Sequence, residues 1–192
     1  VDSYPDSPLI PDTLMTRASM NVFSGNLEKA AQELDELKEI PGGDTMAEEA
    51  DYLLGYVQTQ QATQLLSDFK TEEALEKTRQ ARETYKRLIE SDNLVIANEA
   101  AFQLANLDFT DKQYQDAIAA FRSLKSKERL IESQNERLDR IRDQIRNAGG
   151  NAKQIARIQR ALKREEQKLN AVQANPELAK EAIGKIGEAY LQ

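Results

Sequence analysis

Apolar residues recur along most of the chain at the i, i+3, i+4 and i+7 spacing of a helix that buries one face. Leu14, Ala18, Leu27, Ala30 and Leu34 illustrate this pattern near the start. No segment keeps the period-two alternation of a half-buried strand. The pattern is interrupted mainly at the few Gly, Pro and Asn clusters, which predict turns between helices. We expect an all-α protein.

Small residues within apolar helices predict points where two helices cross closely. Ala18 and Ala30 are separated by the same sequence interval as Ala105 and Ala117. This recurrence predicts a repeated helix-turn-helix unit, because internal repeats of this kind are typical of helical solenoids.

The second unit of this repeat is expected to be longer than the others. If Gly55 and Ala81 are its crossing residues, the interval between them is more than twice that of the other units. The additional residues predict about two extra turns in each helix and a protruding hairpin.

A seven-residue apolar period follows the third unit, with the positions Leu124, Ile131, Leu138 and Ile145, then Ile155, Leu162 and Leu169. One such stripe on each of two helices requires a partner stripe. Residues 148–151 are long enough only to reverse the chain, so we expect an antiparallel coiled-coil hairpin projecting about 30 Å. The second helix of unit three is expected to continue through Lys127 into it. Gln134 and Lys127, at core-like positions, predict a thin seam. Pairing with another copy of the protein is the alternative.

We therefore predict three parts: residues 1–127 with three repeats, residues 128–174 with the coiled-coil hairpin, and residues 175–192 with the first helix of a fourth repeat. That last helix would expose an apolar edge formed by Ile183, Ile186, Tyr190 and Leu191. Such an edge predicts a chain cut from a longer repeat array.

Residues 25–30 and 112–117 resemble the turn and small residue that open the second helix of a tetratricopeptide repeat, and residues 104–105 resemble its Leu-Gly pair. The resemblance covers three repeats and the first helix of a fourth. It implies a right-handed TPR-like solenoid that acts as a protein-protein interaction scaffold. Residues 4–8 and 40–41 resemble the bacterial cell-envelope subfamily of outer-membrane assembly lipoproteins and the Tol-Pal-associated periplasmic coordinator. A periplasmic or envelope location, with possible peripheral envelope association, is implied, with the cytoplasm as the alternative.

In a solenoid of this family the first helices line a concave groove that can bind a protein or peptide. Counting from the small residues places on that groove Met15, Ser19, Tyr52, Tyr56, Phe102, Asn106 and Phe109. Packing between adjacent repeats is the alternative for Tyr52 and Phe102. The family's clamp for acidic chaperone tails requires Lys and Asn at set positions. This chain has Met15, Tyr52 and Phe102 at the first of these positions, so we do not expect that clamp.

Composition excludes many catalytic devices, because the chain contains no cysteine and no histidine. Thiol nucleophiles, disulfides, Cys/His zinc sites and Ser-His-Asp triads are therefore absent. Adjacent glutamates such as Glu48 and Glu49 point about 100° apart on a helix and do not converge. The glycine pairs lack the context of a phosphate-binding loop. We expect no enzyme, no cofactor, no metal and no small-molecule substrate.

Charge is distributed unevenly along the chain. Residues 1–116 contain 10 Lys and Arg against 23 Asp and Glu, whereas residues 117–192 contain 16 against 10. The distal half of the expected hairpin has nine basic residues against two acidic ones, namely Arg137, Arg140, Arg142, Arg146, Lys153, Arg157, Arg160, Lys163 and Arg164.

Several interpretations are open for this basic tip. It could be a solvated flank, or it could contact an acidic protein or an anionic lipid. Nucleic acid is disfavoured, because no aromatic residue that could stack on bases lies between Phe121 and Tyr190. No apolar stretch approaches the length of a membrane-spanning helix. The alternative to a scaffold is thus a structural spacer or oligomerisation module that acts through the hairpin.

Overall fold

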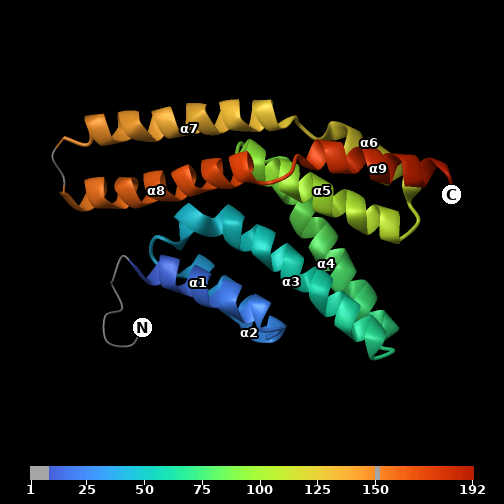
Figure 1. The fold of residues 1–192 in the computed structure, drawn as a ribbon. Coiled ribbons are helices and arrows are strands. Elements are labelled where there is room, and N and C mark those ends of the chain that lie inside the picture. The colour runs from blue at the N-terminus through green and yellow to red at the C-terminus, as the bar shows by residue number, and fades with distance from the viewer. Residues whose placement is uncertain (1–8, 150–151) are drawn as a thin grey trace. The chain divides into compact units, whose positions relative to one another are not determined.

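The structure, a computed structural model, describes residues 9–149 and 152–192, and every regular element in these ranges is a helix (Figure 1). The expectation of an all-α protein is confirmed. The chain divides into two compact units, Val1–Glu90 and Ser91–Gln192, which are considered separately below as unit one and unit two.

Unit one consists of two antiparallel helical hairpins joined by a short 3-10 helix (Figure 1). Its elements are α1 (Ile10–Phe23), α2 (Leu27–Glu39), η1 (Gly43–Met46), α3 (Ala47–Ser67) and α4 (Thr71–Ile89). The hairpins pack together through α2 and α3. Leu14, Ala18, Ala30 and Leu34 are completely buried in the core of this unit, as their helical spacing predicts. Burial of these apolar faces stabilises the unit far more than helix propensity does.

Unit two contains the remaining helices: α5 (Leu94–Thr110), α6 (Tyr114–Ser123), α7 (Lys127–Asn147), α8 (Ala152–Ala174) and α9 (Leu178–Tyr190). The α5–α6 hairpin packs against α9, whereas α7 and α8 pack side by side and run in opposite directions (Figure 1). The rings of Phe102 and Phe121 meet edge to face at 5.8 Å in the core that Ala105, Ala117 and Ala182 complete. The helix α9 therefore contacts α6, although α7 and α8 separate the two in the chain.

Three turns, between α1 and α2, α3 and α4, and α5 and α6, share one backbone geometry. Their central residues Gly25, Phe69 and Lys112 all have a positive φ, at 75°, 59° and 61°. In each turn, the N–H of the next residue donates to the carbonyl five residues earlier, and these N···O distances are 2.8, 2.9 and 2.8 Å. This is the Schellman arrangement, in which a left-handed residue ends one helix and satisfies its last carbonyls.

The same three turns place small residues in register. Ala62 and Ala74 flank the second turn at the same sequence interval as Ala18 and Ala30 around the first and Ala105 and Ala117 around the third. All six alanines are at most 5% exposed. Within each hairpin the two helices therefore cross closely at an equivalent position.

This register corrects the sequence-based pairing of Gly55 with Ala81. The equivalent pair is Ala62 and Ala74, so the additional length of α3 and α4 lies on the side of this crossing that is away from the turn. Gly55 forms a second close contact there, because a Cβ atom on it would lie 2.8 Å from the ring of Tyr85. The helices α3 and α4 have 21 and 19 residues, compared with 14 and 13 in α1 and α2.

The expectation of one continuous helix through Lys127 is wrong, since α6 ends at Ser123 and α7 begins at Lys127. Contacts from other parts of the unit stabilise the break. The backbone N–H of Lys125 donates to Oδ1 of Asn98 at 2.7 Å. The side chain of Ser126 accepts a hydrogen bond from the first turn of α7, as a helix N-cap does. The break thus leaves few backbone donors without partners.

The α7–α8 interface contains a buried polar cluster at its centre, defined as Gln134, Arg137, Glu165 and Lys168. Gln134 is 1% exposed, and its Nε2 donates to Oε2 of Glu165 at 2.8 Å and to the backbone oxygen of Glu165 at 2.9 Å. Arg137 Nε lies 3.1 Å from Oε2 of Glu165, and Lys168 Nζ lies 2.7 Å from its Oε1. Burial by itself raises the pKa of Glu165, but Lys168, Gln134 and Arg137 together lower it below 4.5. The carboxylate is therefore held in its charged form.

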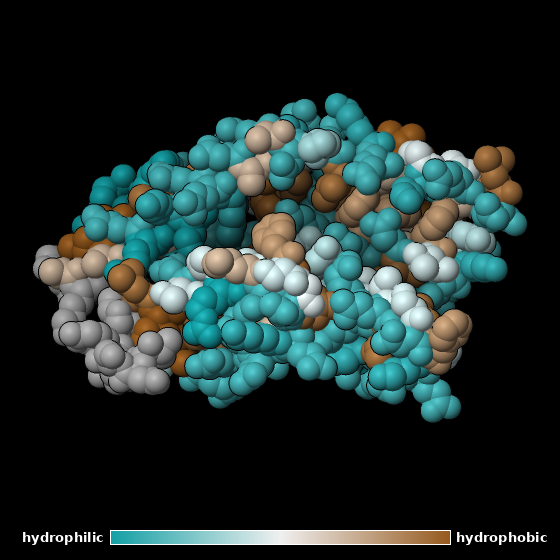
Figure 2. All heavy atoms as spheres, turned by 60° about the horizontal axis from the view of Figure 1, so that its bottom comes forward, coloured by the Kyte–Doolittle hydropathy of each residue, from teal (hydrophilic) through white to brown (hydrophobic). Residues whose placement is uncertain are grey.

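The face drawn in Figure 2 is largely hydrophilic, with hydrophobic residues in small separate groups. Among the residues that the structure describes, no helix combines the length and the apolar character needed to cross a bilayer. Single exposed apolar residues are normal on protein surfaces and do not by themselves indicate a binding site.

Candidate functional site

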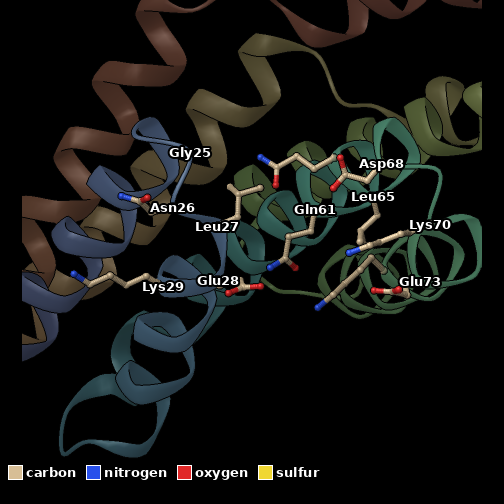
Figure 3. Close-up of a pocket in the computed structure, with 12 residues that line it drawn as sticks. Gly25, Asn26, Leu27, Glu28, Lys29, Gln61, Leu65, Asp68, Lys70 and Glu73 are labelled. Atoms are coloured by element: carbon tan, nitrogen blue, oxygen red, sulfur yellow. The ribbon is translucent and has the colours of Figure 1, made fainter.

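An open hollow of about 720 Å³ lies in unit one between the α1–α2 turn and the turn end of the α3–α4 hairpin (Figure 3). It is called the unit-one hollow below. Residues from the start of α2 form one side of it, and residues from the end of α3 and the start of α4 form the other. Its lining is Gly25, Asn26, Leu27, Glu28, Lys29, Gln61, Gln64, Leu65, Asp68, Lys70, Glu73 and Lys77.

The repeated turn geometry positions this lining. Gly25 adopts a positive φ, which glycine does at little cost, and the chain then enters α2 with Leu27 buried at its first position. Across the hollow, Gln61 and Leu65 are one turn apart on α3 and therefore present the same face. The hollow thus has an apolar floor from Leu27 and Leu65 beneath a polar rim.

Gln61 contributes the hollow's unsatisfied hydrogen-bonding group. Its Oε1 is buried and has no hydrogen-bond partner among the described residues. A buried acceptor without a partner costs on the order of 1–3 kcal/mol. A bound N–H donor would remove that cost.

The rim of the unit-one hollow is mixed in charge. It contains three carboxylates and three ammonium groups, from Glu28, Asp68, Glu73, Lys29, Lys70 and Lys77. A rim with both signs favours a polar polypeptide over a strongly anionic or cationic ligand. Within residues 9–149 and 152–192, no group of three acidic side chains is arranged to hold a metal ion.

None of the seven groove residues expected from the sequence lines the hollow. The four in unit one are half-buried: Met15 packs against the core, Ser19 Oγ donates to the Met15 carbonyl at 2.9 Å, and the Tyr52 ring lies 6.2 Å from that of Tyr85. Tyr56 also belongs to α3. Tyr52 therefore packs within the α3–α4 hairpin.

The three expected groove residues of unit two belong to α5. Phe102 is 7% exposed and part of the core, where its ring meets that of Phe121 in the same hairpin. Phe109 meets Tyr114 edge to face at 5.5 Å, and Lys185 Nζ lies 5.3 Å above its ring. Asn106 is half-buried. Phe102 is therefore not available to a ligand, whereas Asn106 and Phe109 remain partly accessible.

The residues of the expected basic tip lie on α7 and α8. On α7, Arg137 contacts Glu165, Arg142 contacts Asp139 and Glu166, and Arg146 contacts Asp143. Arg140 and Lys163 are exposed, and Arg160 is half-buried. Arg157 is exposed and Arg164 half-buried. The side chain of Lys153 lies outside the described residues, as does the expected motif at residues 4–8.

Two acidic residues just beyond the segment from Arg137 to Arg164 reduce the positive charge of the tip. Glu165 and Glu166 follow Arg164 directly, and each contacts an arginine of α7. The excess of seven positive charges between Arg137 and Arg164 falls to five when these two carboxylates are included. An anion would meet a weaker field at the tip than the sequence count implies.

No protein-family model matches the chain, and the comparisons with curated proteins and with solved structures give no match.

Proposed function

We propose that this chain is a non-enzymatic, TPR-like scaffold that binds a segment of another protein in the unit-one hollow. The three equivalent turns support a repeat architecture, because the sequence interval from Gly25 to Phe69 differs by only one position from that between Phe69 and Lys112. Helical-hairpin repeats build extended surfaces rather than enclosed catalytic pockets. In this proposal α9 resumes the repeat after an inserted coiled-coil hairpin formed by α7 and α8.

The observation that supports the hollow as the binding surface is the buried Oε1 of Gln61, which has no hydrogen-bond partner within residues 9–149 and 152–192. An extended polypeptide supplies backbone N–H donors that suit this oxygen, and apolar side chains that suit Leu27 and Leu65. The mixed rim charges from α2 and α4 then select among polar sequences.

Site-specific photocrosslinking tests this function. A photoreactive residue replaces Gln64, which is exposed and lines the hollow, or Gln32, which is exposed on α2 away from it. We expect one protein to be captured from the Gln64 position and not from Gln32. Unlabelled chain should compete for it, whereas chain carrying Leu65→Asp should not. Equal capture from both positions, or equal competition by both chains, would contradict the proposal.

The second candidate function is a spacer or oligomerisation module that acts through α7 and α8. Its support is that exposed Arg140 and Lys163 on this pair would attract the acidic residues 1–116 of another copy, which contain 23 Asp and Glu. It predicts concentration-dependent self-association in sedimentation, lost when both residues are changed to Glu. The binding-scaffold proposal predicts no dependence on these two residues.

We also propose a periplasmic or envelope location, with the cytoplasm as the alternative. Its support is the resemblance of the chain to bacterial envelope scaffolds. Fractionation of the native cells tests it, and recovery of the protein only with cytoplasmic markers would overturn it.

A further inference from the structure

Unit two contains a second, smaller cavity of about 230 Å³ where α5, α7, the end of α8 and the start of α9 meet. It is called the unit-two cavity. Val95, Leu130, Val172 and Leu178 provide apolar walls from four helices. Its volume is several times the roughly 30 Å³ that one water molecule occupies in the liquid, so it has room for a side chain.

Two charged residues that line the unit-two cavity, Lys127 and Glu177, are held by neighbouring groups. Lys127 Nζ donates to the backbone oxygens of Gln173 and Asn175 at 2.5 and 2.9 Å, and thereby caps the end of α8. The N–H of Lys127 donates to Oε1 of Glu177 at 3.2 Å. These contacts use the positive charge of Lys127 on the helix end, where it is favourable.

Asn98 is only partly satisfied. Its Oδ1 accepts from the Lys125 N–H at 2.7 Å, which orients the amide, but its buried Nδ2 has no hydrogen-bond partner in the part of the chain that the structure describes. Asn98 is 4% exposed and lines the cavity. A buried donor of this kind favours a ligand that brings a carbonyl oxygen.

Glu99, the next residue, lines the same cavity, and its carboxylate suits a cationic ligand. Burial raises the pKa of Glu99 above 4.5, and the opposing effect of Lys168 does not cancel it. Lys168 already lies 2.7 Å from Glu165, which explains why its charge is shared. Among the described residues, Glu99 is thus opposed only by the shared charge of Lys168, and a cation entering the cavity would supply a full counter-charge.

We propose that the unit-two cavity binds an arginine side chain presented by a partner polypeptide. The guanidinium contacts Glu99, the aliphatic stem packs against Val95, Leu130 and Val172, and Asn98 Nδ2 donates to a carbonyl of the presented segment. A guanidinium suits a partly buried carboxylate better than an ammonium does, because it is less strongly hydrated and offers several donors in one plane. This inference is independent of the unit-one hollow.

An NMR titration of the full chain tests the proposal with Nα-acetyl-arginine methylamide as the probe. The matched control ligand is the citrulline analogue, which has nearly the same shape but no charge. We expect shift changes centred on the Asn98 side chain and on the methyl groups of Val95, Leu130, Val172 and Leu178. The citrulline analogue should bind at least about tenfold more weakly, since a charged hydrogen bond is lost.

Two variants sharpen the test. Glu99→Gln should weaken binding of the arginine probe at least about tenfold, whereas Glu188→Gln, an exposed change on α9 away from the cavity, should leave it unchanged. Circular dichroism verifies that both variants remain helical. Equal binding of the two probes, equal binding by wild type and Glu99→Gln, or the absence of shifts at the cavity would overturn the proposal. Tighter binding of free arginine than of the capped probe would also overturn it, because the ligand would then be the amino acid.

Discussion

The polar cluster between α7 and α8 yields a prediction about the stability of this helix pair. Gln134→Leu removes the amide that donates to the Glu165 carboxylate at 2.8 Å, while a leucine fills nearly the same space. The lost bond involves a charged acceptor, which corresponds to about 1.5–3 kcal/mol. Glu165→Leu removes the same bond from the other side, and Arg137 and Lys168, 33% and 19% exposed, can turn to solvent.

The double variant Gln134→Leu/Glu165→Leu should behave differently from the sum of the two single variants. It replaces a polar layer by an apolar one, and such replacements are often neutral or stabilising by about 1–4 kcal/mol. Each single variant should therefore lower the free energy of α7–α8 opening by about 2 kcal/mol, and the double variant should recover most of that loss.

Native-state hydrogen exchange of the α7 amides near Leu138 measures this opening free energy locally. Gln144→Leu, an exposed change on the same helix, serves as the control and should shift it by less than about 0.5 kcal/mol. The reasoning is refuted if the double variant loses as much as the two single variants added together, or if Gln134→Leu loses nothing.

The same cluster predicts a pH signature. Since the pKa of Glu165 is lower in the folded chain than its ordinary value of 4.5, the carboxylate stabilises the folded state above that value. This contribution should disappear as the pH falls from 4.5 through the folded-state pKa. In Glu165→Leu the opening free energy of α7–α8 should show less of this decline, and an unchanged decline would contradict the assignment.

Three further changes test other local features by urea unfolding. Gly55→Ala should destabilise the chain by about 1–3 kcal/mol, because the new Cβ would lie 2.8 Å from the Tyr85 ring. The control Gly187→Ala should be neutral or stabilising, because its Cβ would meet no described atom within 4 Å. Equal effects of the two changes would contradict the close crossing. Phe69→Gly should stabilise by about 1 kcal/mol, because Phe69 has a φ of 59° and a 93% exposed side chain; a loss of stability would contradict this. Glu99→Gln should stabilise the folded chain at neutral pH, because burial raises the pKa of Glu99 and its ionised form therefore opposes folding. The gain in unfolding free energy should vanish below pH 4.5, and a gain that persists there would contradict this reasoning.

Local spacing predicted the helices and part of the core. Ala18 and Ala30 are both completely buried, as are Ala105 and Ala117, because each pair lies on the apolar face that helical periodicity defines. The predicted second crossing, at Gly55 and Ala81, is wrong. The equivalent residue Ala62 lies among glutamines and threonines, and the sequence around Phe69 does not resemble the Gly25 turn. A left-handed position is recognised in a sequence by glycine, and a phenylalanine there gives no such signal. Phe69 adopts this conformation because the packing of the two helices compensates its cost.

The break between α6 and α7 could not be predicted because its partners are distant in sequence. Asn98 reaches Lys125 across 27 residues, and Glu177 reaches Lys127 across 50. Residues 124–126 themselves contain no proline or glycine that would end a helix. Tertiary hydrogen bonds thus override a local pattern that favours continuation.

The candidate sites follow the same logic. The unit-one hollow brings the α1–α2 turn next to Gln61 and Leu65, and no periodicity links those positions. In the unit-two cavity, Asn98 and Glu99 are adjacent polar residues in the first half of α5, whose other residues from Leu94 to Phe102 are apolar. This contrast is a signal that points to them in the sequence. Polar residues at buried positions are costly unless they are satisfied. Among the residues that the structure describes, the Oδ1 of Asn98 accepts from Lys125 and its Nδ2 has no partner, so the fold explains only half of its place in the core. The proposed ligand would accept from Nδ2 and would explain the other half.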